Sequence, residues 1–254
     1  MDIELSTEGG ILTLAFNRLE KKNAITSAMY QTLSDGVAQA ESDASVRVII
    51  IAGQPQIFTA GNDLEDFMKN PPSGPHSPVF QFMQQMIACS KPIIAAVAGP
   101  AVGIGTTLLL HCDLVYAAEN AKFSMPFSQL GLCPEFASSL LLPQLVGERR
   151  AAEKLLMGEP FLAVEAAAMG LVNRVLAADE LMPFVAGQAA KLAALPGSSV
   201  RTTKRLMKAD QVEAIKARIT EENQAFSAML QAPEAKEAFA AFFEKRKPDF
   251  SRFA

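Results

Sequence analysis

The segment VRVIIIAG at residues 46–53 decides the fold class, because six of its first seven residues are apolar. A continuous apolar run of this length is typical of a strand that is covered on both faces, as in a parallel sheet between helices. Similar runs recur outward from it, PIIAAV at 92–97 and LVYA at 114–117, with helical patterns near 79–89 and 104–111. This alternation predicts an α/β domain with a largely parallel sheet.

The two ends of the chain differ from this middle part. Residues 3–5 and 11–16 alternate in polarity around the turn EGG at 8–10, which predicts a β-hairpin, and Thr26 can cap a helix that runs to about Ala40. Beyond Phe136 the pattern becomes mostly helical, so we expect a core domain over residues 1–195 and a helical C-terminal region over 196–254. The stretch NPPSGPHSP at 70–78 predicts a mobile surface loop.

Composition excludes several classes of protein. The chain has 254 residues, of which 50% are hydrophobic, and a net charge of -4, so it lacks the positive charge that attracts nucleic acid. No apolar run approaches the length that spans a membrane, and the start lacks the pattern of a secretory signal. Cys89, Cys112 and Cys133 form no CxxC pair, which argues against a disulfide framework and a thiolate metal site. We therefore expect a cytoplasmic protein without a bound metal.

Two glycine-rich loops follow predicted parallel strands: AGQPQIFTAGNDL at 52–64 and GPAVGIGTT at 99–107. Ligands bind at the carboxyl edge of such sheets, and free backbone amides there can donate to an anionic oxygen. Alternatively, the glycines only permit tight turns. The spacing does not match the dinucleotide fingerprint GxGxxG, and no Walker motif follows.

Histidine is limited to His76, in the Pro-rich stretch, and His111, which lies among leucines and is expected in the core. A Ser-His-Asp triad or a histidine metal centre is therefore disfavoured. Any proton transfer falls to carboxylates.

Four segments occur in an order that resembles a known family: NRLEKKNAI at 17–25, AGND at 60–63, KPIIAAVAGPAVG at 91–103 and EKRKP at 244–248. Together they resemble the enoyl-CoA hydratase/isomerase (crotonase) superfamily over nearly the whole chain. The resemblance implies a crotonase (ClpP/crotonase-like) fold of repeated β-β-α units with a C-terminal helical layer. It also implies an acyl-CoA partner, with coenzyme A as part of the substrate and no separate cofactor. Residues 196–254 would then mediate assembly as a homotrimer or a dimer of trimers.

The same resemblance implies site residues. The backbone amides of Ala60 and Ile104 would form an oxyanion hole for the thioester oxygen, where fixed donors stabilise developing negative charge. Lys245 would contact the CoA phosphates, or it is simply solvated at a helix end. Asp63 is expected to cap the next helix rather than to take part in catalysis. The substrate and CoA contacts would be Ala24, Ala60, Gly61, Asn62, Asp63, Leu64, Gly103, Thr107, Phe127 and Pro134.

Hydratases of the superfamily carry two glutamates at the positions that Thr107 and Phe127 occupy here, so ordinary hydration is disfavoured. Instead PFSQLGLCPE at 126–135 is similar to peroxisomal-type Δ3,Δ2-enoyl-CoA isomerases, which implies that Glu135 is a single catalytic base. Glu135 could alternatively cap a helix that begins near Phe136. Those isomerases carry Gly where Phe136 stands, so Phe136 is expected to narrow or reshape the acyl pocket.

Two other functions remain open at this point. One is different chemistry on a CoA enolate, such as weak hydration, thioester hydrolysis or decarboxylation. The other is a non-catalytic CoA-binding scaffold.

Overall fold

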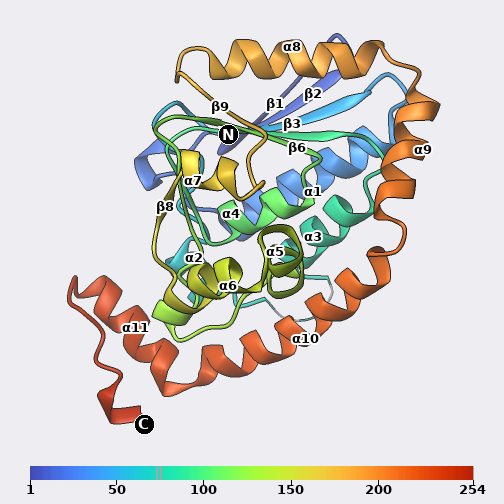
Figure 1. The fold of residues 1–254 in the computed structure, drawn as a ribbon. Helices are drawn as coiled ribbons and strands as arrows, with labels where there is room; N and C mark the ends of the chain where they lie inside the picture. Colours follow the sequence, from blue (N-terminus) through green and yellow to red (C-terminus); the bar gives the residue numbers. More distant parts are fainter. Residues whose placement is uncertain (73, 75, 254) are drawn as a thin grey trace.

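A sheet of six strands lies at the centre of the computed structural model, which describes residues 1–72, 74 and 76–253 (Figure 1). The first two strands form the predicted antiparallel hairpin, and every later neighbour pairs in parallel. In sheet order the strands are β1 (Ile3–Glu8), β2 (Ile11–Phe16), β3 (Val48–Ala52), β4 (Ile93–Val97), β6 (Leu114–Ala118) and β9 (Arg174–Leu176). The predicted α/β class is confirmed.

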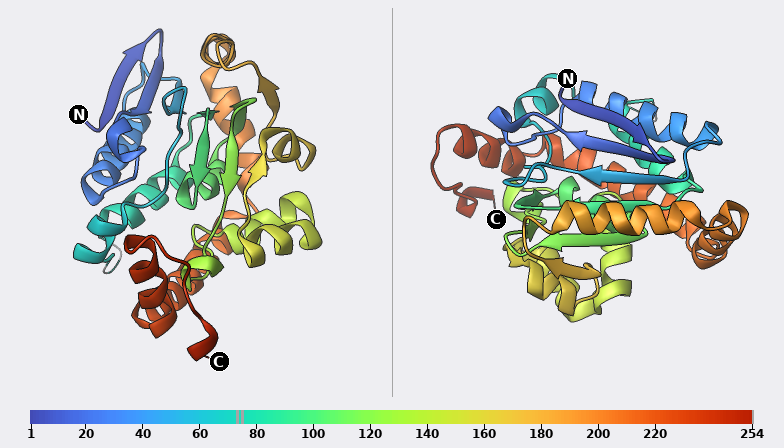
Figure 2. Two further views of the ribbon diagram at one scale, coloured as in Figure 1. Left: turned by 90° about the vertical axis from the view of Figure 1, so that its left-hand side faces the viewer. Right: turned by 90° about the horizontal axis from the view of Figure 1, so that it is seen from above.

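Helices cover both faces of this sheet, which explains the continuous apolar strands. Ile49 and Ile51 of β3 point into the larger core under α1 (Ser27–Ser42) and α3 (Pro78–Ala88), whereas Val48 and Ile50 pack against α8 (Leu181–Ala194). Figure 2 shows α8 on one side of the sheet and α1 with α3 on the other. Thr26 caps α1 as predicted, since its hydroxyl accepts a hydrogen bond from the Met29 amide.

A second, smaller sheet lies beyond the carboxyl ends of the central strands. It consists of β5 (Pro100–Val102), β7 (Lys122–Ser124) and β8 (Phe161–Leu162). The helix expected over 104–111 is shorter, because α4 (Ile104–Thr107) continues only as a 3-10 turn to His111. The remaining short helices are α2 (Leu64–Lys69), α5 (Ser138–Val146), α6 (Glu148–Ala152) and α7 (Ala163–Ala168).

The C-terminal region is helical, as the sequence predicted. The helices α9 (Gly197–Lys208), α10 (Val212–Gln231) and α11 (Pro233–Phe243) run down one side of the α/β core and beneath it (Figure 1). Lys204 and Lys208 anchor α9 by ion pairs of 2.7 and 2.9 Å to Asp113. The proposed domain boundary and the assembly role of this region remain predictions.

The connection between α2 and α3 carries the predicted Pro-rich loop. Ser73 and Pro75 lie outside the described residues, and the mobility of the loop remains a prediction. Of the helices that the structure describes, none is both long and apolar enough to cross a membrane.

Candidate active site

The two glycine loops touch each other at the carboxyl edge of the sheet. Thr59 and Ala101 pair as a parallel bridge, the Thr59 amide donates to the Pro100 carbonyl at 3.1 Å, and the Val102 amide donates to the Thr59 carbonyl at 3.0 Å. Gly61 has a φ of +86°, and a Cβ there would lie 2.8 Å from the Val102 oxygen. Glycine is therefore required for this approach.

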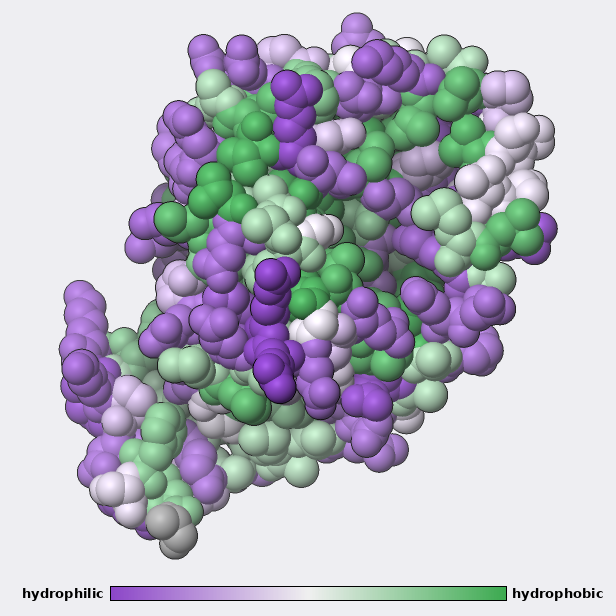
Figure 3. All heavy atoms as spheres, viewed as in Figure 1, coloured by the Kyte–Doolittle hydropathy of each residue, from purple (hydrophilic) through white to green (hydrophobic). Residues whose placement is uncertain are grey.

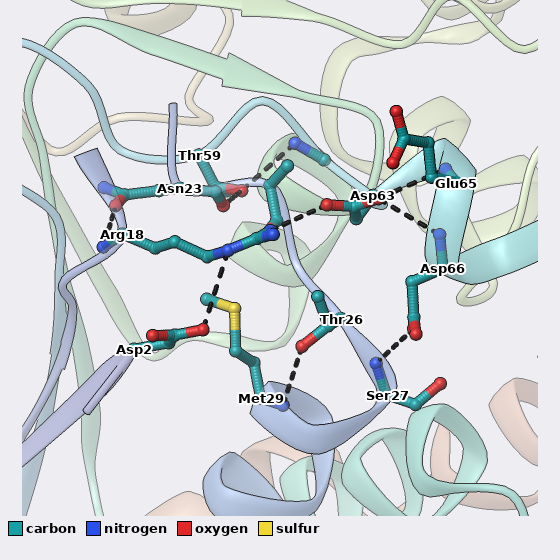
Figure 4. Close-up of polar contacts among 12 residues, drawn as sticks. Asp2, Arg18, Asn23, Thr26, Ser27, Met29, Thr59, Asp63, Glu65 and Asp66 are labelled. Atoms are coloured by element: carbon teal, nitrogen blue, oxygen red, sulfur yellow. Dashed lines mark hydrogen bonds and ion pairs between the residues drawn. The ribbon is translucent and has the colours of Figure 1, made fainter. Parts of the chain in front are cut away.

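A buried asparagine fixes the segment that precedes the first loop. The Asn23 amide group donates to the Ile57 and Phe58 carbonyls, and its side-chain oxygen accepts from the Arg18 amide. The Thr59 hydroxyl donates to the Asn23 carbonyl at 2.6 Å (Figure 4). No sequence pattern had assigned a role to Asn23, although asparagine tolerates its positive φ of 54° better than most residues do.

Asp63 ends this loop as the predicted helix cap. Its carboxylate accepts from the amides of Glu65 and Asp66, both at 3.1 Å, and from the Arg18 guanidinium at 2.7 Å (Figure 4). Partial burial opposes ionisation, but these hydrogen bonds outweigh it and lower the pKa of Asp63. The expectation of a capping role is confirmed.

The two expected oxyanion donors differ in their present partners. The Ala60 amide donates to the Lys22 carbonyl at 3.0 Å, so it would have to share or release this bond to hold a thioester oxygen. Ile104 is the first residue of α4, a position whose amide has no acceptor within the helix. Both residues line the same cleft.

That cleft has a volume of about 450 Å³ and opens beside the two loops. Four phenylalanines from α10 and α11, which no sequence pattern had marked, form part of its wall: Phe226, Phe239, Phe242 and Phe243. Lys21 and Lys22, also unmarked, contribute two cationic side chains. The predicted site residues that line the cleft are Ala24, Ala60, Gly61, Asn62, Asp63, Leu64, Gly103, Ile104 and Phe127.

Three predicted contacts are not among the described residues that line the cleft: Thr107, Pro134 and Lys245. Thr107 is fully buried and donates to Glu135. Lys245 follows α11 on the surface, two residues after Phe243. Their contact with substrate remains a prediction.

A smaller pocket of about 30 Å³, here called the inner chamber, shares lining residues with the cleft and has Glu135 in its wall. Asn62, Phe67 and Phe226 line both spaces, and the rings of Phe67 and Phe226 meet edge to face with centroids 6.2 Å apart. Apolar side chains such as Met83 form much of the chamber. Of the described residues that line it, Glu135 is the one acid.

Glu135 is 5% exposed, and burial raises its pKa to about 8. The Thr107 hydroxyl donates to its Oε1 at 2.5 Å and partly opposes this rise, whereas the nearby Glu222 carboxylate adds to it. Thr107 lies three residues after Ile104, about 4.5 Å along the axis of a helix. Helix α4 thus carries both the Ile104 amide and the Thr107 hydroxyl that holds the Glu135 carboxylate.

Tyr30 is another residue in the surroundings of Glu135. Its hydroxyl donates to Asn62 Oδ1 at 2.5 Å, and burial, together with the charge of Glu135, raises its pKa well above the ordinary value. Tyr30 therefore stays neutral and orients the amide of Asn62 at the junction of the cleft and the chamber.

The capping alternative for Glu135 is wrong. Helix α5 begins at Ser138, and its first amides are capped by Glu222 of α10, which accepts from Ala137 at 2.6 Å and from Ser139 at 3.0 Å. The side chain of Glu135 instead bonds to Thr107.

Phe136 does not narrow the acyl pocket by lining it, and a reshaping effect remains a prediction. Phe136 is fully buried and stacks on His111 with ring centroids 3.8 Å apart, and it lines neither the cleft nor the chamber. His111 Nε2 donates to the Phe136 carbonyl at 2.8 Å, and burial lowers the pKa of His111 to about 4. His111 is thus a neutral core residue, as predicted.

Comparison with known proteins places these features in context. The model of the enoyl-CoA hydratase/isomerase family matches residues 6–252. The chain is 36% identical to the rat enoyl-CoA delta isomerase 2 over 97% of its own length, and it spans 64% of that protein. It is 31% identical to the 2,3-dehydroadipyl-CoA hydratase of Escherichia coli K12, with 98% of both chains covered. The crystal structure of an enoyl-CoA hydratase/isomerase from Pseudoalteromonas atlantica superposes with a TM-score of 0.94 at 40% identity, covering 98% of this chain and 100% of that one.

Proposed function

The chain belongs to the enoyl-CoA hydratase/isomerase family and has its crotonase fold, and we propose that it acts as a Δ3,Δ2-enoyl-CoA isomerase with Glu135 as the acid and base. The observation that carries the proposal is the inner chamber. Glu135 is the one carboxylate among the described residues that line it, and it is nearly excluded from water.

The reaction needs a single carboxylate. Ionised Glu135 takes a proton from C2 of a 3-enoyl thioester, and the electron pair moves into a dienolate whose oxygen accepts hydrogen bonds from the amides of Ala60 and Ile104. The same carboxyl group then gives the proton to C4, which leaves the 2-enoyl thioester. No water is consumed. The high pKa of Glu135 suits this shuttle, because the group must be protonated midway.

The cleft is suited to the CoA portion of the substrate. Its apolar wall of phenylalanines would contact the pantetheine arm, and the ammonium groups of Lys21 and Lys22 would attract the phosphates. Lys245, two residues after the lining residue Phe243, would add a third ammonium group. The thioester would lie between the two glycine loops, with the C2 to C4 segment of the acyl chain directed past Asn62 toward Glu135.

Assembly as a homotrimer or a dimer of trimers in the cytoplasm is part of this proposal. On the face drawn in Figure 3, hydrophobic side chains are exposed among hydrophilic ones. The exposed apolar residues of the chain include a group that follows α6 and extends into α7: Leu156, Met157, Leu162 and Val164. A contact between subunits would remove such residues from water.

Hydration is the second candidate, because the Escherichia coli relative that covers nearly the whole chain is named a hydratase. The positions expected to carry the two hydratase glutamates hold Thr107 and Phe127, and neither side chain can activate water. We therefore rank hydration below isomerisation.

The test is the conversion of 3-hexenoyl-CoA and longer 3-enoyl-CoAs to their 2-enoyl isomers by wild type and by Glu135→Gln. Binding of a CoA ester is measured for both proteins, and products are weighed by mass spectrometry. Unchanged mass with a shifted double bond, lost in the variant while binding persists, supports isomerisation. A gain of water identifies hydration, and binding without turnover would leave a non-catalytic scaffold.

A further inference from the structure

We propose that Glu222, on α10, is a positioning residue for the base: its carboxylate holds the backbone turn at Phe136 and Ala137 that directs Glu135 into the inner chamber. This inference rests on the proposed catalytic role of Glu135. Glu222 is distant in sequence, and none of its atoms lines the cleft or the chamber among the described lining residues.

The contacts of Glu222 are concentrated on the turn after Glu135. One carboxylate oxygen accepts from the Ala137 amide at 2.6 Å. The other accepts from the amide and the hydroxyl of Ser139, at 3.0 and 2.6 Å. Burial raises the pKa of Glu222, whereas these three donors and the charge of Arg218 oppose the rise and favour the ionised carboxylate. Glu222 is only 5% exposed, so water competes little for these bonds.

The turn needs such a support because its backbone is strained. Phe136 and Ala137 have φ values of +58° and +56°, and neither is glycine. A left-handed conformation is unfavourable for any residue that has a Cβ, and hydrogen bonds to a charged group are among the stronger ones in proteins, so those from Glu222 can offset this strain. The ring of Phe136 is held independently by its stack on His111.

The turn is also what orients the base. The Glu135 carbonyl accepts from the amide and the hydroxyl of Ser138, at 3.1 and 2.6 Å, which closes the backbone behind the side chain. The Glu135 carboxylate itself accepts a hydrogen bond from the Thr107 hydroxyl. A relaxed turn would therefore change the direction of the Glu135 side chain before it moved any other residue that contacts substrate.

Among the groups around Glu135, Glu222 is the one whose negative charge raises the pKa of Glu135. Thr107 faces it from α4 and the neutral Tyr30 from α1, while Cys133 precedes it in the same loop. His111 is neutral, and Arg218 pairs with Glu221 and donates to the Ser139 hydroxyl, both at 3.2 Å. Glu222 thus adds to the burial that keeps the pKa of Glu135 high.

The experiment compares Glu222→Ala, Glu222→Gln and the matched control Glu213→Gln, which removes an exposed carboxylate from the same helix. We expect Glu222→Ala to lower kcat on the order of 100-fold with little change in the affinity for a CoA ester, because misplacement of a catalytic group has effects of that size. Glu222→Gln keeps an acceptor for the Ala137 amide, so its loss should be smaller. The control should keep wild-type kcat.

A second-site change separates positioning from general damage. Glycine adopts a positive φ without strain, so Ala137→Gly combined with Glu222→Ala should recover part of the lost kcat. If the double variant is no more active than Glu222→Ala, while both are folded by circular dichroism, the positioning role is wrong.

A readout without turnover distinguishes this inference from the proposed function. Carbon-13 NMR titration of the Glu135 carboxyl, assigned by its absence in Glu135→Gln, should give a lower pKa in Glu222→Gln than in wild type and no change in Glu213→Gln. If the shift is seen but wild type does not isomerise 3-enoyl-CoA, the proposed function fails and the contact with Glu222 stands. If wild type isomerises and neither the shift nor the loss of kcat occurs, the role of Glu222 alone is refuted.

Discussion

The loop that ends at Asp63 and the loop that ends at Glu135 each bring one carboxylate to the same site, but they treat it in opposite ways. Asp63 receives an Arg18 ion pair and two backbone amides, which lower its pKa. Glu135 is buried with a single hydroxyl as donor and a second carboxylate nearby, and its pKa is raised to about 8.

The difference shows that surroundings, not residue type, assign the roles of these two acids. A carboxylate that is fully satisfied by donors is a fixed structural charge. A carboxyl group whose charged and neutral forms are close in free energy near neutral pH can take up and release a proton within a catalytic cycle. Glu135 meets the second condition and Asp63 the first.

The largest effect should come from removing each carboxylate in turn. Glu135→Gln should lower kcat on the order of 10³-fold, because it removes the single acid and base. Asp63→Asn, which keeps an acceptor for the α2 amides, should change kcat less than tenfold and act mainly through binding or stability. Steady-state rates with a 3-enoyl-CoA measure both. Comparable losses of kcat in the two variants would erase the distinction between the loops.

The second effect is on stability as a function of pH. The pKa of Glu135 is raised above its ordinary value of 4.5, so the native state binds more protons than the unfolded state between that value and about 8. Its burial therefore becomes destabilising as pH rises through this window, and Glu135→Gln should become more stable than wild type there, by a few kcal/mol at most. Urea unfolding at a series of pH values measures this. A stability difference that does not change with pH would contradict the raised pKa.

Asp63 should behave in the opposite sense. Its pKa is lowered, so its contribution to stability is present above the unfolded-state pKa and is lost as pH falls through the folded-state value. Asp63→Ala removes both the cap and the partner of Arg18, which should lower the free energy of unfolding by about 2 kcal/mol at neutral pH. Denaturation of Arg18→Met provides the comparison, since it breaks the ion pair, together with the Arg18 contacts to Ala24 and Asp2, but keeps the cap. If the cap contributes, Arg18→Met should be the milder variant.

Much of the fold could be predicted because its signals are local. The apolar run at β3 and the Thr26 cap of α1 are each contained in a few consecutive residues. The strands β7, β8 and β9 have only three, two and three residues, too short for a periodic pattern to mark them. Their pairing depends on neighbours that are far away in the sequence.

In the site, too, the local features could be predicted and the long-range contacts could not. The glycine loops and Asp63 were predictable because their chemistry lies within one segment. The surroundings of Glu135 were not, since Thr107, Tyr30 and Glu222 reach it from three different helices. The positive φ of Phe136 is likewise invisible in sequence, where glycine would have been expected. Only tertiary packing supplies the contacts that hold it.

The smallest effect concerns the one hydrogen bond donated to the base. Thr107→Val keeps the shape of the side chain but removes the hydroxyl that donates to Glu135, a bond that lowers the pKa of the carboxyl. The pKa of Glu135 should then rise further, by less than about one unit, which corresponds to about 1.4 kcal/mol. Because the base must be ionised, the acidic limb of the rate profile should move to higher pH, while the rate at its alkaline plateau stays nearly unchanged. Thr106→Val is the matched control, since the neighbouring Thr106 hydroxyl donates to the Ala101 carbonyl instead. A shift of the acidic limb to lower pH in Thr107→Val would mean that this hydroxyl does not stabilise the ionised base, and the contrast with the donor-rich Asp63 would then need another cause.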